Sequence, residues 1–170
     1  MRTHLVTLTV LLPLLLVLPP SSGFGQESAY AGRVGFSASI QGSQGDILVP
    51  VWITDSFSLA PSLGLVWAQD SGTDVRFAIV PRVYFRKDRI APFIGGRIGV
   101  LVSSPSVGSS TTDWVVGLAA GGEYFLDDHF SLGVESQLNL SISDENSNRF
   151  GNPDGTTLNT AAAVYATFYF

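Results

Sequence analysis

Hydrophobic and polar residues alternate with a period of two along most of this chain. The clearest case is residues 158–170, which read LNTAAAVYATFYF. Every second residue back from Phe170 is apolar except Thr160, whereas the intervening row is smaller and more polar. A period of two places successive side chains on opposite faces of a β-strand. The pattern therefore predicts a strand with two different faces.

Turn signals separate eight stretches of this kind. We expect strands at residues 30–40, 47–53, 57–69, 74–86, 91–102, 113–126, 130–142 and 157–170. The connections alternate between short ones (54–56, 87–90 and 127–129) and longer ones (41–46, 70–73, 103–112 and 143–156). Short turns at one end and longer loops at the other are typical of transmembrane barrels with an even number of antiparallel strands.

The two faces of these strands favour a membrane barrel over a soluble one. From the third strand to the seventh, one face is apolar and uncharged, as in Leu63, Leu65 and Trp67. The other face carries charges at mid-strand depth: Arg33, Arg76, Arg82, Arg97, Glu123 and Glu135. Because this pattern puts apolar residues outside and polar residues inside, we predict an all-β fold, an eight-stranded antiparallel up-and-down transmembrane β-barrel over residues 26–170. Residues 47–53 are apolar on both faces, so their register stays open.

The beginning of the chain predicts export. Arg2 and His4 precede an apolar run over residues 5–18, which Pro19 and Pro20 end. This is the pattern of a secretory signal peptide, and the run is too short to span a membrane comfortably. We expect cleavage after Gly25, so that residues 1–25 are the signal peptide. The chain is 45% hydrophobic, has no cysteine and has no later apolar run of membrane-spanning length, which again favours a barrel.

The strand pattern, the turn at residues 53–59 (ITDSFSL) and the terminal aromatic strand resemble the small outer-membrane β-barrel proteins of Gram-negative bacteria. This is the group of OmpX-like, OmpA-transmembrane-domain-like and opacity-like barrels. The resemblance implies a place in the bacterial outer membrane, with both chain ends in the periplasm. It also implies that Phe168 and Phe170 form a signal read by the barrel-assembly machinery. The implied partners are outer-membrane lipid, that machinery and periplasmic chaperones. We expect a monomer without a cell-wall-binding domain.

Aromatic residues lie near the expected strand ends, where interfacial aromatic belts form in membrane proteins. The predicted periplasmic girdle consists of Tyr30, Phe57, Phe85, Tyr124, Phe130, Phe168 and Phe170. Trp67 and Trp114 are predicted to mark the outer interface.

The inward charges allow two interpretations. An eight-stranded barrel is just wide enough for side chains to fill, and a buried charge is costly unless it is paired. Glu123 and Glu135 would then pair with some of Arg33, Arg76, Arg82 and Arg97 to plug the lumen. Tyr84, Phe93, Phe125, Tyr165 and Tyr169 would fill the ends. The alternative is a narrow anion-selective path lined by the excess arginines. Interior glycines would make room for large side chains, allow coiling, or leave cavities.

Two short motifs partly match known functional sites, one a catalytic serine with its base and the other a calcium-binding loop. His129-x-Ser131, with Glu135 nearby, slightly resembles an element of outer-membrane lipid A deacylases, since a nucleophilic serine needs a base. Residues 127–132 repeat the pattern of residues 54–59, however, which favours a turn, so we expect no enzyme. The stretch from Asp144 to Asn148 lacks the glycine and glutamate that complete a calcium loop, and we expect no metal or other cofactor.

The expected outer loops are acidic. They hold Asp46, Asp70, Asp113, Asp144, Glu145 and Asp154 against Arg149 alone. Direct binding of nucleic acid or anionic lipopolysaccharide by the loops is therefore disfavoured. The basic residues at 86–89 would lie at the periplasmic rim, near anionic headgroups.

Three functions follow from this reading. The first is a structural or surface-interaction protein, in adhesion or envelope integrity, with a plugged lumen. The second is a narrow pore for small solutes. The third is a lipid-modifying enzyme. The pattern favours the first and does not identify a surface ligand.

Overall fold

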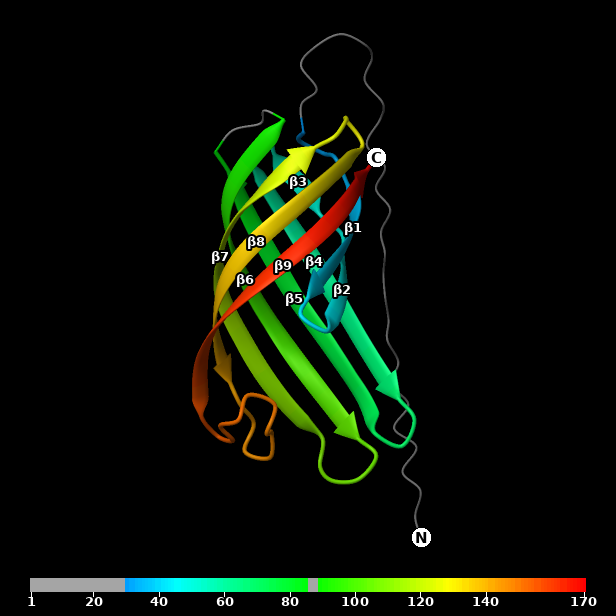
Figure 1. The fold of residues 1–170 in the computed structure, drawn as a ribbon, viewed down its shortest axis with the longest axis vertical. Helices are drawn as coiled ribbons and strands as arrows, with labels where there is room; N and C mark the ends of the chain where they lie inside the picture. The colour runs from blue at the N-terminus through cyan, green and yellow to red at the C-terminus, as the bar shows by residue number, and fades with distance from the viewer. Residues whose placement is uncertain (1–29, 86–88) are drawn as a thin grey trace.

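Antiparallel strands dominate the computed structural model, which describes residues 30–85 and 89–170 (Figure 1). They are β1 (Gly35–Gln41), β2 (Gln44–Leu48), β3 (Val51–Thr54), β4 (Phe57–Ala68), β5 (Gly72–Tyr84), β6 (Ile90–Pro105), β7 (Thr111–Phe125), β8 (Phe130–Ile142) and β9 (Thr156–Tyr169). Over these two ranges, no helix has the length and apolar character needed to cross a membrane. The predicted signal peptide, residues 1–25, lies outside the described residues, as do residues 86–88 of the basic cluster.

The strands close into a barrel. β2 and β3 follow one another along the same neighbour, β4, and together take the place of one barrel strand. β1 pairs with β2 on one side and with β9 on the other, which closes the sheet. Because β2 and β3 share one position, the barrel has eight strand positions, called staves below. The prediction of an all-β, eight-stranded antiparallel up-and-down barrel is confirmed. Tyr30 and Phe170 lie at one end of the barrel, called here the terminal end. The opposite end, where β4–β5, β6–β7 and β8–β9 are connected, is the loop end (Figure 1).

The break between β2 and β3 falls at Pro50. Proline has no backbone N–H to donate to a ladder, so it removes a hydrogen bond at its position and favours an interruption there. Leu48 and Trp52, on either side of Pro50, are buried inside the barrel, whereas Ile47 and Ile53 are exposed on its outside. The register that the sequence leaves open is thereby settled.

The connection between β1 and β2 is shorter than predicted. The loop expected over residues 41–46 is wrong, because β1 runs to Gln41 and β2 begins at Gln44. Gly42 has a φ of +59°, and glycine at the first of two turn positions suits a tight hairpin. Asp46 is consequently a strand residue rather than a loop residue.

The β1–β2 hairpin also reaches less far toward the loop end than the other three hairpins (Figure 1). The pairing of β2 with β4 stops at Leu63, although β4 continues to Ala68. The pairing of β1 with β9 stops at Val164, although β9 begins at Thr156. Among the described residues, no strand therefore pairs with residues 64–68 of β4 or 156–163 of β9 on the hairpin side. These two stretches are called the unpaired edges.

The outer face of the barrel is apolar. Leu65, Leu118 and Leu158, on three different strands, are each more than 60% exposed. Inward-facing positions alternate with them and are mostly buried, except at the loop end of β4, where residues 65–68 are all exposed. Trp67 and Trp114 are exposed on the outside toward the loop ends of β4 and β7. The faces predicted for the third to the eighth strand agree with this arrangement.

Candidate functional site: the barrel lumen

At the terminal end, aromatic side chains pack together inside the barrel. Trp52 is 1% exposed and packs with Tyr84 and Tyr169, at ring-centroid distances of 4.5 and 6.4 Å. Phe93 and Phe125 belong to the same buried cluster, which Tyr165 and Ala91 extend. We call the five residues Trp52, Tyr84, Tyr169, Phe93 and Phe125 the aromatic plug. Four of them are predicted lumen fillers, whereas Trp52 is missing from the prediction because the register of its strand was open.

Tyr30 covers the aromatic plug from outside the barrel mouth. Its ring lies 4.9 Å from that of Trp52 and 5.3 Å from that of Phe125. The prediction that Tyr30 belongs to the lipid-facing girdle is wrong. The turn at Gly32, whose φ is +85°, separates Tyr30 from the strand alternation that follows it. Tyr30 therefore packs against the aromatic plug.

Glu123 lies fully buried beside the aromatic plug and is held by hydroxyl groups. It accepts hydrogen bonds from the Tyr84 hydroxyl at 2.7 Å, the Tyr169 hydroxyl at 2.8 Å and the Ser131 hydroxyl. The expectation from the charge pattern was an arginine partner. Arg33 instead lies 5.2 Å from the Tyr30 ring, and its Nη1 has no hydrogen-bond partner among the described residues.

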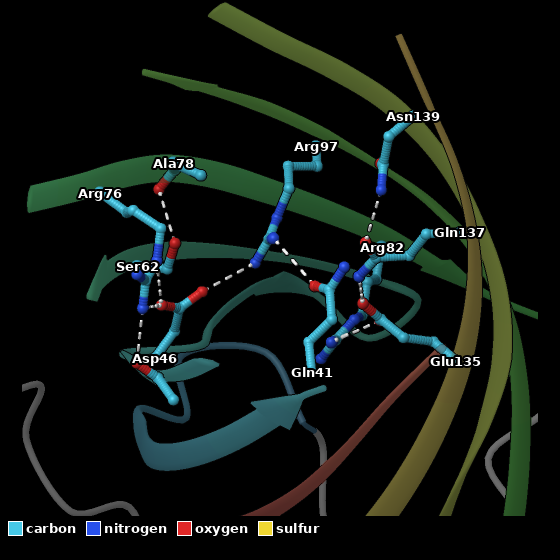
Figure 2. Close-up of polar contacts among 11 residues, drawn as sticks. Gln41, Asp46, Ser62, Arg76, Ala78, Arg82, Arg97, Glu135, Gln137 and Asn139 are labelled. Carbon is cyan, nitrogen blue, oxygen red and sulfur yellow. Dashed lines mark hydrogen bonds and ion pairs between the residues drawn. The ribbon is translucent and has the colours of Figure 1, made fainter. Parts of the chain in front are cut away.

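In the middle of the lumen, Arg82 and Glu135 form an ion pair of 2.8 Å across the barrel (Figure 2). Gln137 donates to Glu135 at 2.6 Å, and Asn139 donates to Gln137 at 3.2 Å, so a chain of polar groups follows β8. The Arg82 guanidinium also lies over the Tyr165 ring, 4.3 Å from its centroid. Both charges of this pair are therefore neutralised and enclosed.

Toward the loop end, Arg76 and Arg97 share one carboxylate, that of Asp46 (Figure 2). Arg76 lies 2.9 Å from one Asp46 oxygen, and Arg97 lies 3.3 Å from the other. Arg97 also contacts the Gln41 side chain at 3.4 Å. The prediction that Asp46 is an acidic outer-loop residue is wrong, because the short turn at Gly42 brings it into β2 with its side chain inward. Alternation back from Trp52 through Leu48 would have placed it there.

A cavity of about 620 Å³ adjoins this pair of arginines at the loop end. Its charged lining residues are Arg76, Arg97, Arg149 and Asp46. Neutral polar groups from Gln41, Ser62, Asn139, Ser141 and Asn159 share the wall with apolar ones from Leu101, Val115, Phe150 and Ala161. The lumen is thus packed at one end and hollow at the other.

Several residues assigned to acidic outer loops take part in a polar cluster at the rim of this cavity. Arg149 lies 2.9 Å from Asp74 and 3.5 Å from Asp113. Asp113 is fully buried in β7 and accepts from the Ser147 hydroxyl at 2.8 Å and the Asp144 amide at 2.9 Å. The prediction that Asp113 is a loop charge is therefore wrong. The cluster ties the connection at residues 143–155 to β5 and β7.

Two aspartates outside the membrane-spanning segments cap turns. Asp127 accepts from the amides of His129 and Phe130 at 2.7 and 2.8 Å, and these bonds lower its pKa. Asp144 accepts from the amides of Asn146 and Thr112, which likewise lower its pKa. Asp144, which begins the stretch that resembles a calcium loop, is thus held by one backbone amide within the stretch and by one from β7.

The His129-x-Ser131 motif is not assembled as a nucleophile and base. His129 sits in the turn before β8, and its ring stacks 6.2 Å from that of Phe168. Ser131 is fully buried and donates to Glu123. The two residues face different surroundings because His129 lies in the turn before β8, outside the strand alternation, whereas Ser131 is an inward position of β8.

The predicted assembly residues lie on the outside of the terminal end. Phe168 and Phe170 are exposed, and their rings meet edge to face at 5.3 Å. The Phe170 amide donates to the carbonyl of Val34, the residue before β1, at 2.9 Å. Arg89, the described member of the basic cluster, lies 5.4 Å from the Tyr124 ring.

An apolar outside, a polar and aromatic inside, and eight antiparallel staves define the fold of a small transmembrane β-barrel. The N-terminal β-barrel domain of Pseudomonas aeruginosa OprF has this fold, with a TM-score of 0.54 and 14% identity over 84% of this chain and 100% of that one. Neisserial surface protein A is similar, with a TM-score of 0.56 and 13% identity over 85% of this chain and 100% of that one. No protein-family model matches the sequence, and no curated protein matches it significantly. At such identities the likeness concerns the fold.

Proposed function

We propose that the protein is an integral outer-membrane barrel with a plugged lumen and a structural or surface-interaction role. The barrel is a rigid mount, and the loop end meets the environment in adhesion or envelope integrity. In this proposal the terminal end lies in the periplasm and the loop end lies outside. The apolar outer face, the fold and the predicted signal peptide all support this location.

The aromatic plug is the observation that carries the proposal. Trp52, Phe93 and Tyr169 are each at most 2% exposed, and Glu123 is fully buried among hydroxyls beside them. The lumen of an eight-stranded barrel is no wider than the side chains that fill it. A solute that entered from the loop end would meet this plug with no route around it.

Single-channel recording in planar bilayers tests the plug. We expect no steady open events from the wild type, once a heat-dependent gel shift has shown that the protein is folded. Trp52→Ala removes the largest ring of the plug and should produce transient openings. Steady conductance of the wild type would refute the plug.

A narrow anion path is the second candidate function, and the arginine-rich cavity favours it. The floor of the cavity is positively charged, and the cavity lies at the loop end, where anions would enter from outside. This candidate requires steady, anion-selective current that falls in Arg97→Gln. The same recordings therefore decide between the two.

The partners proposed for biogenesis are the barrel-assembly machinery and periplasmic chaperones, through the terminal strand. The exposed rings of Phe168 and Phe170 support this role. Phe170→Ser should lower the fraction of protein that becomes heat-modifiable in cells. An unchanged fraction would contradict the assembly signal at this position.

A further inference from the structure

We propose that the loop-end cavity binds a single-chain amphiphile with an anionic headgroup, such as a long-chain carboxylate, which enters sideways from the outer leaflet between the unpaired edges. This inference goes beyond the proposed function, which concerns the plugged end of the lumen. It uses the orientation given above, with the loop end outside. The plug closes the other end, so the cavity is a binding chamber rather than part of a channel.

The unpaired edges lie at the depth of the outer leaflet. A transmembrane β-strand needs about 9–11 residues to cross, and β4 has 12. Residues 64–67 therefore lie in the last third of the crossing, where Trp67 marks the interface. Open sheet edges do not occur against hydrocarbon and are tolerated only beside protein or a water-filled cavity. Residues 159–162 of β9 and residues 41–44 of the β1–β2 hairpin line the cavity, so the β9 edge lies beside it. The proposed entry from lipid passes over the tip of the short hairpin.

The cavity floor has an excess of positive charge. Two guanidinium groups, of Arg76 and Arg97, share the single carboxylate of Asp46. The Nε atoms of Arg97, Arg82 and Arg149 are all buried without a hydrogen-bond partner among the described residues, so exposure is what distinguishes Arg97. Its side chain is 18% exposed, in contrast to 5% for Arg82, whose charge is neutralised by Glu135. Arg97 is therefore the group best placed to receive an anionic headgroup.

The rest of the cavity wall matches the other parts of an amphiphile. The Ser141 hydroxyl, at the polar side, lacks a hydrogen-bond partner among the described residues. Leu101, Val115 and Ala161 add apolar surface for an acyl chain. The volume of about 620 Å³ falls within the range of roughly 300–1,000 Å³ that small-molecule sites occupy. A free inorganic anion would use the arginines and leave the apolar wall and the side passage without a role.

Binding of dansyl-undecanoic acid to the protein in phosphatidylcholine nanodiscs tests the proposal. We expect saturable binding that Arg97→Gln weakens about ten- to a hundredfold, as the loss of a charge-assisted hydrogen bond implies. Arg97→Lys should restore part of the affinity because it keeps the charge. Arg33→Gln is the matched control, since it makes the same change at the opposite end and should leave binding unchanged.

A second variant keeps the test independent of the arginine. Ala161→Trp fills the cavity without altering its charge and should abolish binding while the heat-dependent gel shift persists. Equal binding of a cationic amphiphile, or unchanged binding in both Arg97→Gln and Ala161→Trp, would overturn the proposal. Displacement of the probe by equimolar inorganic phosphate would overturn it as well, since it would indicate a simple anion site.

Photo-crosslinking tests the sideways entry. A fatty acid with a diazirine in its chain should label residues 64–68 and 156–163 in the wild type and lose this labelling in Arg97→Gln. Labelling of the remaining lipid-facing belt, around Leu118 and Leu132, is the internal control and should not change. Uniform labelling that is insensitive to the variant would refute entry between the unpaired edges.

Discussion

The two ends of the barrel interior are built on the same eight strands. Yet one end is packed with aromatic rings and the other contains a cavity. At the terminal end, large rings lie opposite glycines, as Tyr165 lies against Gly133 and Phe93 against Gly121. At the loop end the inward positions carry shorter or charged groups, such as Ser62, Ser141 and Arg97, beside the cavity. Strand number sets the width of a barrel, and the choice of inward side chains decides whether that width is filled.

Trp52→Ala should lower the free energy of unfolding most, because it leaves a cavity in the packed end of the barrel. Removing a fully buried tryptophan from a packed core costs about 3–5 kcal/mol. Urea titration of refolded protein, followed by the gel shift, measures the change. Trp67→Ala is the control, since Trp67 is 70% exposed on the lipid side and its loss should cost much less. Equal losses for the two variants would contradict the tight packing of Trp52 inside the barrel.

Gly133→Ala should come next. A β-carbon at Gly133 would collide with the Tyr165 ring, which the Arg82 guanidinium also contacts. Overpacking of this kind costs about 1–3 kcal/mol. The matched substitution Gly122→Ala lies on the lipid side, where a β-carbon meets nothing within 4 Å, and should be close to neutral. The same urea titration compares the two, and similar midpoints would refute the fitted packing of glycine against tyrosine.

At the hollow end, Asp46→Ala should cost less, about 1–2 kcal/mol. The cost lies between those of surface and fully buried pairs because the cavity lets water reach Arg76 and Arg97 after their partner is removed. The effect should be local to the β1–β2 hairpin. Amide hydrogen exchange should accelerate at residues 40–48 and stay unchanged around Trp52. Acceleration throughout the barrel would show that the two ends are coupled.

The smallest effect is expected from the pH dependence of the capped connection at the loop end. The pKa of Asp144 is lowered in the folded protein by the amides of Asn146 and Thr112. Its contribution is therefore complete above the ordinary aspartate pKa of about 3.9 and is lost as the pH falls through the lower folded value. Amide exchange at Thr112 should rise only in that acidic window. In Asp144→Ala it should be fast at every pH, and a rise near neutral pH in the wild type would assign the effect to another group.

How much could be predicted differs between regions for physical reasons. Alternation with a period of two suffices wherever one face is apolar and the other polar, which is why the inward charges from Arg76 to Glu135 were placed on the lumen side. It fails between Ile47 and Ile53, where both faces are apolar and Pro50 interrupts the ladder. Because the register of this stretch stayed open, Trp52 could not be assigned to the lumen side.

The error over Asp46 has a different origin. An acidic residue close to Gly42, Ser43 and Gly45 suits a loop by composition, so the strand was started too late. The pairing partners of the charges were also beyond the pattern. Alternation along the strands shows that Glu123 and Glu135 point inward. Which groups they meet depends on the relative register of distant strands, which brings Arg82 to Glu135 and hydroxyl groups to Glu123.

The hydroxyl donors to Glu123 come from three different strands. Tyr84 lies on β5, Ser131 on β8 and Tyr169 on β9, while the carboxylate itself lies on β7. A chain whose last strand has not yet docked leaves this carboxylate one donor short beside apolar rings, where an unsatisfied charge is strongly disfavoured. Docking of β9 thus supplies the missing hydroxyl at the moment it seals the seam with β1. The hydrogen bond from Tyr169 therefore couples the satisfaction of the buried Glu123 side chain to the pairing of the last strand.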